Sequence, residues 1–383
     1  MKVGIDASNL RQGGGRTHLI ELLRHGDGNA GGVVRVVVWA SRETLDTLPD
    51  GAWLELRHEP MLDHGLFQRV AWQQTRLPTL VRDVDLLFAP GGITSPVARP
   101  RVVMSQNMLP FDDAQRRRNG IGARRLRLEL LRRVQSRSFV SADGVIFLTA
   151  YAQREVCRAL PRRPRHIVII PHGVGERFRM DPRPQSPRAA FGTDRPFRLL
   201  YVSAVTAYKN QLNLLAAVAT LRRELPVELT LVGPPRGAGA GARLQQAIDA
   251  MEHGGKYVRY LGEVRFDDVH RCYRECDVFV FASSCENMPN ILIEAMSSGL
   301  PIACARRGPM PEILGDAGVY FDPEDRDDIA AAIRRLADDA SLRFTLGVRA
   351  HERSRAYNWD RCARATFGFL EEVAAIRRSS RLQ

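Results

Sequence analysis

Short apolar runs alternate with helix-like stretches along the whole chain. Most of the apolar runs are rich in Val, Ile and Leu and lack polar alternation, which is typical of strands covered by helices on both faces. The pattern predicts an α/β protein with two doubly wound parallel sheets of about six strands each. The expected strands are residues 2–6, 33–39, 85–89, 101–105, 144–148 and 166–170, and then 198–203, 228–232, 258–261, 278–282, 301–305 and 318–321.

The length of 383 residues agrees with two domains, each large enough for its own core. Four prolines among charged and small residues in 178–196 indicate a linker. We therefore predict a first domain over 1–180, a linker over 181–196, a second domain over 197–356 and a tail over 357–383. Doubly wound sheets bind ligands beyond the carboxyl ends of their strands, so we expect the active site in a cleft between facing domains.

The composition narrows the class of protein. No apolar run approaches the roughly 20 residues of a membrane-spanning helix. The N-terminus enters a strand-like run without the pattern of a signal peptide. Six cysteines in a chain of this size indicate reduced thiols, and their spacing does not match a zinc site. The sequence therefore predicts a cytoplasmic protein.

The net charge of +13 is concentrated in the first half of the chain. Residues 1–190 carry 30 basic and 18 acidic residues, whereas residues 191–383 carry 26 and 25. The segment Arg116–Arg137 holds nine arginines and one acid, with leucines at helical spacing. Either it rests on an anionic membrane surface or it is a solvated helix whose leucines pack on their own domain. A nucleic-acid binder is a third interpretation, although the run lacks interleaved aromatic residues.

Two glycine-rich segments are candidate anion sites. Gly13, Gly14 and Gly15 follow the first expected strand and open a helical pattern, where backbone N–H groups can approach an anion. The alternative is a tight strand-to-helix turn. Residues 237–242 fit the dinucleotide pattern G-x-G-x-x-A, but they begin well after the preceding strand ends. We interpret them as a surface loop. The alternative function of a nicotinamide-dependent dehydrogenase is supported by this pattern alone.

The most specific segment is 281–301, which runs from a strand through a polar loop into a helix that begins near Pro289 and ends at Gly299. Glu286 lies in the loop and Glu294 lies in the helix, eight positions later. A diphosphate at the helix start would place one carboxylate beside a neighbouring sugar and the other near two vicinal hydroxyl groups.

These residues, together with 260–264, 276–286 and the Gly308–Ile313 stretch, closely resemble glycosyltransferase family 4. The resemblance is strong over roughly 198–345 and weaker over 1–180. It implies the GT-B fold, with two Rossmann-like domains facing across a cleft. It also implies retaining, metal-independent transfer of a sugar and a last helix that packs back on the first domain.

The family's functional residues carry over position by position. Glu294 matches the glutamate that holds the ribose of the donor nucleotide, Glu286 matches the one that contacts the donor sugar, and Lys209 matches the lysine that neutralises the diphosphate. The arginine that often precedes this lysine by five positions is Ala204 here, and a first-domain histidine is replaced by Gln106. The predicted site comprises Glu286 and Lys209 as catalytic residues, Gly14, Gly15, Asn287, Met288, Pro289, Asn290, Ile291 and Glu294 at the donor, and Gln106, Asn107 and His172 on the acceptor side.

The expected function is a retaining glycosyltransferase that moves a hexosyl or deoxyhexosyl group to a saccharide or lipid-linked acceptor, in the synthesis of cell-surface polysaccharide or lipopolysaccharide. GDP-mannose is the favoured donor, and no cofactor or metal ion is expected. The enzyme would work on the inner face of the plasma membrane as a peripheral protein that binds no nucleic acid. A sugar-nucleotide epimerase on the same fold is the enzymatic alternative.

Overall fold

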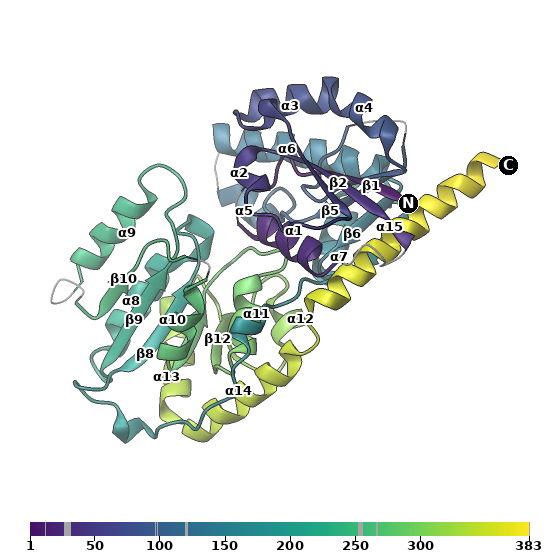
Figure 1. Ribbon diagram of the computed structural model, residues 1–383. Coiled ribbons are helices and arrows are strands. Elements are labelled where there is room, and N and C mark those ends of the chain that lie inside the picture. The colour runs from purple at the N-terminus through teal and green to yellow at the C-terminus, as the bar shows by residue number, and fades with distance from the viewer. Residues whose placement is uncertain are drawn as a thin grey trace. The chain divides into compact units, whose positions relative to one another are not determined.

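The chain folds into two compact units. The computed structural model describes residues 1–11, 13–26, 32–95, 97, 99–118, 122–251, 256–265 and 267–382 (Figure 1). Unit 1 consists of Met1–Gly173 together with Tyr357–Gln383, and unit 2 consists of Val174–Ala356. Each unit is built around one wholly parallel sheet.

Unit 1 contains a seven-stranded sheet in the order β3-β2-β1-β4-β5-β6-β7. Its strands are β1 (Lys2–Asp6), β2 (Arg35–Ala40), β3 (Leu54–His58), β4 (Leu86–Ala89), β5 (Arg101–Ser105), β6 (Gly144–Phe147) and β7 (His166–Ile169). Its helices are α1 (Gly14–Arg24), α2 (Arg42–Leu45), α3 (Leu66–Thr75), α4 (Leu77–Leu80), α5 (Asp113–Arg118), α6 (Ala123–Ser141), α7 (Ala150–Ala159) and α15 (Trp359–Leu382).

Unit 2 contains a six-stranded sheet in the order β10-β9-β8-β11-β12-β13. Its strands are β8 (Phe197–Val202), β9 (Val227–Val232), β10 (Val258–Tyr260), β11 (Val278–Phe281), β12 (Ile302–Ala305) and β13 (Val319–Phe321). Its α-helices are α8 (Gln211–Leu221), α9 (Ala240–Asp249), α10 (Val269–Glu275), α11 (Asn290–Ser297), α12 (Met310–Leu314), α13 (Arg326–Asp338) and α14 (Ala340–Ser354).

The predicted fold class is confirmed, and the one missed strand lies at an edge. The sequence LELRH of β3 alternates apolar and charged residues, and all five residues are only half-buried. Among the residues that the structure describes, it pairs with β2 alone, so it lies at the edge of the sheet. An edge strand of this kind lacks the continuous Val/Ile/Leu run by which the central strands were recognised.

The proline-rich segment 181–196, predicted as a linker, belongs to unit 2. Arg343 of α14 is fully buried and holds this segment. Its guanidinium group donates to Gln185 Oε1 at 3.2 Å, to the Ser186 carbonyl oxygen, and to the Ala337 carbonyl oxygen at 2.9 Å. Because these acceptors satisfy a buried cation, the segment is fixed to the body of unit 2.

Helix α15 returns the end of the chain to unit 1 and packs beside α1 (Figure 1). Its apolar stripe buries Phe367, Leu370 and Val373. At Gly144, the first residue of β6, an added Cβ would lie only 2.9 Å from Val373 Cγ2. A residue without a side chain at this position therefore allows close packing of α15 on the sheet. A polar contact adds to the packing, because His25 Nδ1 lies 2.8 Å from Asp360 Oδ1.

Three rings stack in the interior of unit 1, where α1 meets α15. His18 lies 4.8 Å from His172 and 6.0 Å from Trp359 between ring centroids, and both histidines are buried. Burial, followed by the proximity of His172, lowers the pKa of His18 well below its ordinary value. His18 is therefore neutral in the folded protein at neutral pH.

This stack predicts a loss of stability in acid. The unfolded chain protonates His18 near pH 6.5 whereas the folded chain does not, so the free energy of unfolding falls as the pH drops below that value. The contribution reaches about 1.4 kcal/mol per pH unit. Urea unfolding of the wild type and of His18→Phe between pH 5 and 7 measures it: the variant should show the smaller slope. His64→Gln, at an exposed histidine, is the control. Equal slopes for wild type and His18→Phe would refute the assignment.

Candidate active site

The loops that follow β8 and β11 lie at one edge of the unit 2 sheet. These strands are parallel neighbours, with Leu199 opposite Val278 and Leu200 opposite Phe279. Their carboxyl ends therefore meet at the same edge. The first loop carries Lys209 and the second carries Glu286, which brings together the two predicted catalytic residues.

Lys209 and Glu286 form an ion pair that is largely shielded from solvent. The ammonium Nζ of Lys209 donates to Glu286 Oε1, and the two side chains are 9% and 14% exposed. Burial alone would lower the pKa of Lys209, but the charge of Glu286, its hydrogen bond and the nearby Tyr208 and Cys285 together outweigh burial and raise the pKa. Lys209 is therefore a fixed positive charge at this edge of the sheet. A resident anion, the carboxylate of Glu286, balances that charge.

Asn210 ties the two loops together, and sequence reasoning did not single it out. It has φ 53°, the left-handed conformation, which asparagine tolerates better than most residues. Its side-chain amide donates to the Ala282 carbonyl oxygen at 2.8 Å and to Ser284 Oγ at 2.6 Å. The Ser284 amide in turn donates to the Tyr208 carbonyl oxygen at 2.7 Å. In the sequence, the only indication of this role is that Asn210 directly follows Lys209.

Glu294, on α11, has a different partner. It accepts a hydrogen bond from the Tyr273 hydroxyl group at 2.9 Å, and Tyr273 is fully buried. Desolvation raises the pKa of Glu294 to about 7, although the Tyr273 hydrogen bond and the charge of Arg177 lower it in part. The carboxyl group is therefore divided between neutral and ionised forms near neutral pH. Tyr273 is a second residue that the sequence reasoning missed.

The residues between the two glutamates lead into α11. Asn287 and Met288 are buried, and Pro289 precedes the helix with extended backbone, as the sequence predicted from the proline. The positive end of the helix dipole lies at Asn290 and Ile291. The backbone amide groups of Asn290 and Ile291 lie in the first turn of α11, which starts four residues after Glu286.

In unit 1 the structure brings Gly15 and Gln106 together. Gly14 and Gly15 form the first turn of α1, and an added Cβ at Gly15 would lie 2.7 Å from Gln106 Oε1. Asn107 Oδ1 accepts from the Leu109 amide at 3.1 Å, which stabilises its own turn. His172 is only 3% exposed and lies in the ring stack described above.

The run at 237–242 is divided between a loop and a helix. Gly237 and Gly239 have φ of 95° and 69°, and α9 begins at Ala240. Seven residues separate the end of β9 from this helix. The run therefore lacks the direct strand-to-helix turn of a dinucleotide site. Its exposed residues Gly237–Gly239 agree with the predicted surface loop.

Two features are absent from the described residues. No group of three or more His, Cys, Asp or Glu residues in this part of the chain is placed to hold a metal ion. No helix among the same residues combines the length and apolar character needed to cross a membrane.

Comparison with known proteins gives the site its context. The family model described as "Glycosyl transferases group 1" matches residues 196–339, which include Lys209, Glu286 and Glu294. O-antigen chain mannosyltransferase B of Escherichia coli is 27% identical over 235 residues, which cover 60% of this chain and 60% of that protein. The chain spans 60% or less of the first curated relatives that it matches.

Two solved structures share the fold. Sucrose-phosphate synthase of Thermosynechococcus elongatus has a TM-score of 0.75 at 18% identity and covers 96% of this chain and 97% of its own. Anabaena HepE in complex with UDP-glucose has a TM-score of 0.71 at 19% identity, with 99% and 100% covered. The GT-B fold implied by the family resemblance is thereby confirmed.

The link made by Asn210 predicts a measurable loss of stability. Asn210→Gly keeps the left-handed conformation but removes the side-chain hydrogen bonds, so it should lower the free energy of unfolding by about 1–3 kcal/mol. Asn210→Ala adds the strain of a Cβ at positive φ and should cost about 1 kcal/mol more. Urea unfolding of the three proteins tests the ranking. An alanine variant as stable as wild type would contradict the role assigned to Asn210.

Proposed function

We propose that the protein is a glycosyltransferase that takes a sugar from a nucleotide-sugar bound by unit 2. The observation that supports this most is the shielded pair of Lys209 with Glu286, beside the first turn of α11, within the segment that matches the glycosyltransferase family model. A diphosphate would receive positive charge from the ammonium group and from the helix terminus.

The chemistry follows from where charge accumulates. As the bond from the sugar to the diphosphate breaks, negative charge grows on the leaving phosphate and positive charge on the sugar ring. Lys209 and the amide groups near Asn290 stabilise the negative charge on the phosphate, and the carboxylate of Glu286 stabilises the positive charge on the sugar ring. Transfer proceeds with retention through front-face attack, and the leaving phosphate takes the proton of the acceptor hydroxyl group. In this scheme fixed side-chain and dipole charges act in place of a metal ion.

Glu294 would hold the ribose of the donor. An ionised carboxylate accepts hydrogen bonds from two vicinal hydroxyl groups, and the Tyr273 hydroxyl group orients it. In unit 1, Gly14 and Gly15 remain candidate donor contacts, and Gln106 and Asn107 remain candidate acceptor contacts. His172 is buried in the ring stack, so we no longer assign it to the acceptor. The favoured donor is GDP-mannose. The mannosyltransferase relative agrees with this choice, whereas HepE was solved with UDP-glucose.

The glutamates should have separable effects. Glu294→Gln should weaken binding of the nucleoside diphosphate at least tenfold, since hydrogen bonds to a charged group contribute about 1.5–3 kcal/mol. Because the pKa of Glu294 is about 7, wild-type affinity should increase from pH 6 to pH 8, and the variant should lose this dependence. Glu286→Gln should chiefly lower kcat. Calorimetry measures the nucleotide affinity, and nucleotide release in excess EDTA measures kcat.

Three outcomes would count against this proposal. Unchanged nucleotide affinity in Glu294→Gln would remove the ribose contact. Activity lost in EDTA and restored by Mn²⁺ would remove the metal-independent mechanism. Conversion of the nucleotide-sugar without release of nucleotide, whether or not an acceptor is present, would favour an epimerase.

We also propose that the enzyme works at the inner face of the plasma membrane, on a saccharide or lipid-linked acceptor of surface polysaccharide or lipopolysaccharide synthesis. The supporting surface is Arg116–Arg137, which contains the second half of α5 and most of α6; residues 119–121 between them lie outside the described part of the chain. Leu126 is 72% exposed and Leu130 is 61% exposed, so these leucines do not pack on their own domain. Arginines beside exposed leucines are typical of a helix that lies in a lipid interface.

Vesicle binding tests the membrane surface. Leu126→Ser with Leu130→Ser should weaken sedimentation with anionic vesicles by tenfold or more, because each buried leucine contributes about 1.5–3 kcal/mol. Leu212→Ser, at a leucine of α8 that is 51% exposed in the nearly neutral half of the chain, should have no effect. Binding should also fall steeply as salt rises. Wild-type protein that stays in the supernatant at low salt would refute the surface.

A further inference from the structure

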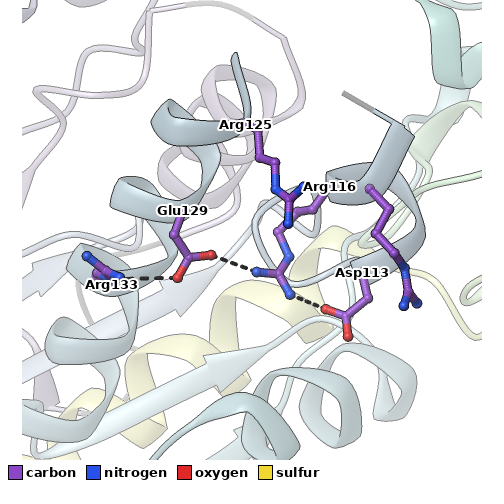
Figure 2. Close-up of a pocket in the computed structure, with 6 residues that line it drawn as sticks. Asp113, Arg116, Arg125, Glu129 and Arg133 are labelled. Atoms are coloured by element: carbon purple, nitrogen blue, oxygen red, sulfur yellow. Dashed lines mark hydrogen bonds and ion pairs between the residues drawn. The ribbon is translucent and has the colours of Figure 1, made fainter. Parts of the chain in front are cut away.

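A pocket of about 360 Å³ lies between α5 and α6 in unit 1, and none of its lining residues belongs to the predicted donor site. Four arginines and two acids line it (Figure 2), namely Asp113, Arg116, Arg117, Arg125, Glu129 and Arg133. The lining therefore has an excess of positive charge, which is unusual for a cavity that only fills space.

Arg116 links the two helices that form this pocket. One arm of its guanidinium group donates to Glu129 Oε2 at 2.7 Å and the other donates to Asp113, so it bridges the two helices (Figure 2). Its side chain is 17% exposed. The hydrogen bond from Arg116 lowers the pKa of Asp113, which stays ionised. Asp113 and Glu129 therefore both bind Arg116.

Glu129 is shared among several arginines. Besides Arg116, it contacts Arg132 at 3.7 Å and Arg133 Nε at 3.6 Å. It is the one acid between Arg116 and Arg137. Asp113 and Glu129 are therefore too few to neutralise all four arginines that line the pocket.

Arg117 and Arg125 are the excess cations. Each lines the pocket from a different helix and both are exposed. The charge of Arg117 helps to lower the pKa of Asp113, but among the described residues neither arginine has a carboxylate oxygen within 4.0 Å. Their charges converge on one cavity, although mutual repulsion would favour separation. Guanidinium groups match the oxygens of a phosphate through two parallel hydrogen bonds, which makes a phosphate the natural counter-ion.

We propose that the α5–α6 pocket binds a phosphate group, as a phosphomonoester or a diphosphate, through Arg117 and Arg125. This site is separate from the donor site, and it does not depend on the proposed glycosyl transfer. The phosphate can come from a lipid headgroup or from a soluble phosphorylated compound. Leu126 and Leu130 each follow a pocket residue by one position on α6. A lipid phosphate would thus have exposed apolar side chains nearby.

Pyrophosphate titration by calorimetry tests the pocket. Arg117→Gln with Arg125→Gln should remove one binding site or weaken it at least tenfold. Arg163→Gln with Arg165→Gln is the matched control, since it removes two exposed arginines of the same unit, outside the pocket, with the same change in net charge. Equal pyrophosphate binding by wild type and pocket variant would overturn the proposal, as would an equal loss in the control.

Two further measurements identify the source of the phosphate and separate this site from the donor site. If pyrophosphate displaces wild-type protein from phosphatidic acid vesicles, the pocket takes a lipid phosphate. If the pocket variant loses pyrophosphate binding but keeps vesicle binding, the natural ligand is soluble. Nucleoside diphosphate affinity should be the same in wild type and pocket variant. A failure of the donor site would instead appear in Glu294→Gln, whose pyrophosphate binding at the pocket should persist.

Discussion

The parallel pairing of β8 with β11 is the constraint on which the candidate site depends. These strands are far apart in the sequence, but their pairing delivers the loop with Lys209 and the loop with Glu286 to the same edge of the sheet. The ion pair between the two side chains then closes the contact, and Asn210 fixes it through the backbone of the second loop. The geometry of the candidate site is therefore a property of strand order rather than of either loop alone.

The same pair sets the electrostatic state of the candidate site. A shielded ammonium group without a partner would cost several kcal/mol, and the carboxylate of Glu286 removes that cost. Glu294 differs, because burial raises its pKa to about 7 and its hydrogen-bond partner, the Tyr273 hydroxyl group, is uncharged.

The sequence was informative where local pattern and topology coincide. Central strands carry uninterrupted apolar runs, so their number and order of appearance were predicted, whereas the half-buried edge strand Leu54–His58 was not. Glu286, Glu294 and Lys209 were found through spacing and family resemblance. Asn210 and Tyr273 were missed because their roles depend on contacts across 72 and 21 positions, which no local motif encodes. The exposure of Leu126 likewise depends on tertiary packing, because helical spacing alone also fits a buried stripe.

The return of α15 to unit 1 has a consequence for how the protein is made. A ribosome releases β1 to β7 first, yet the core that these strands build includes Phe367, Leu370 and Val373 from the end of the chain. Unit 2 is continuous, so it can complete its core as soon as it emerges. The unit that is synthesised first is therefore finished last. Until then the surface around Gly144 that receives α15 is uncovered, and a nascent chain stalled before its final helix would present that apolar surface to chaperones.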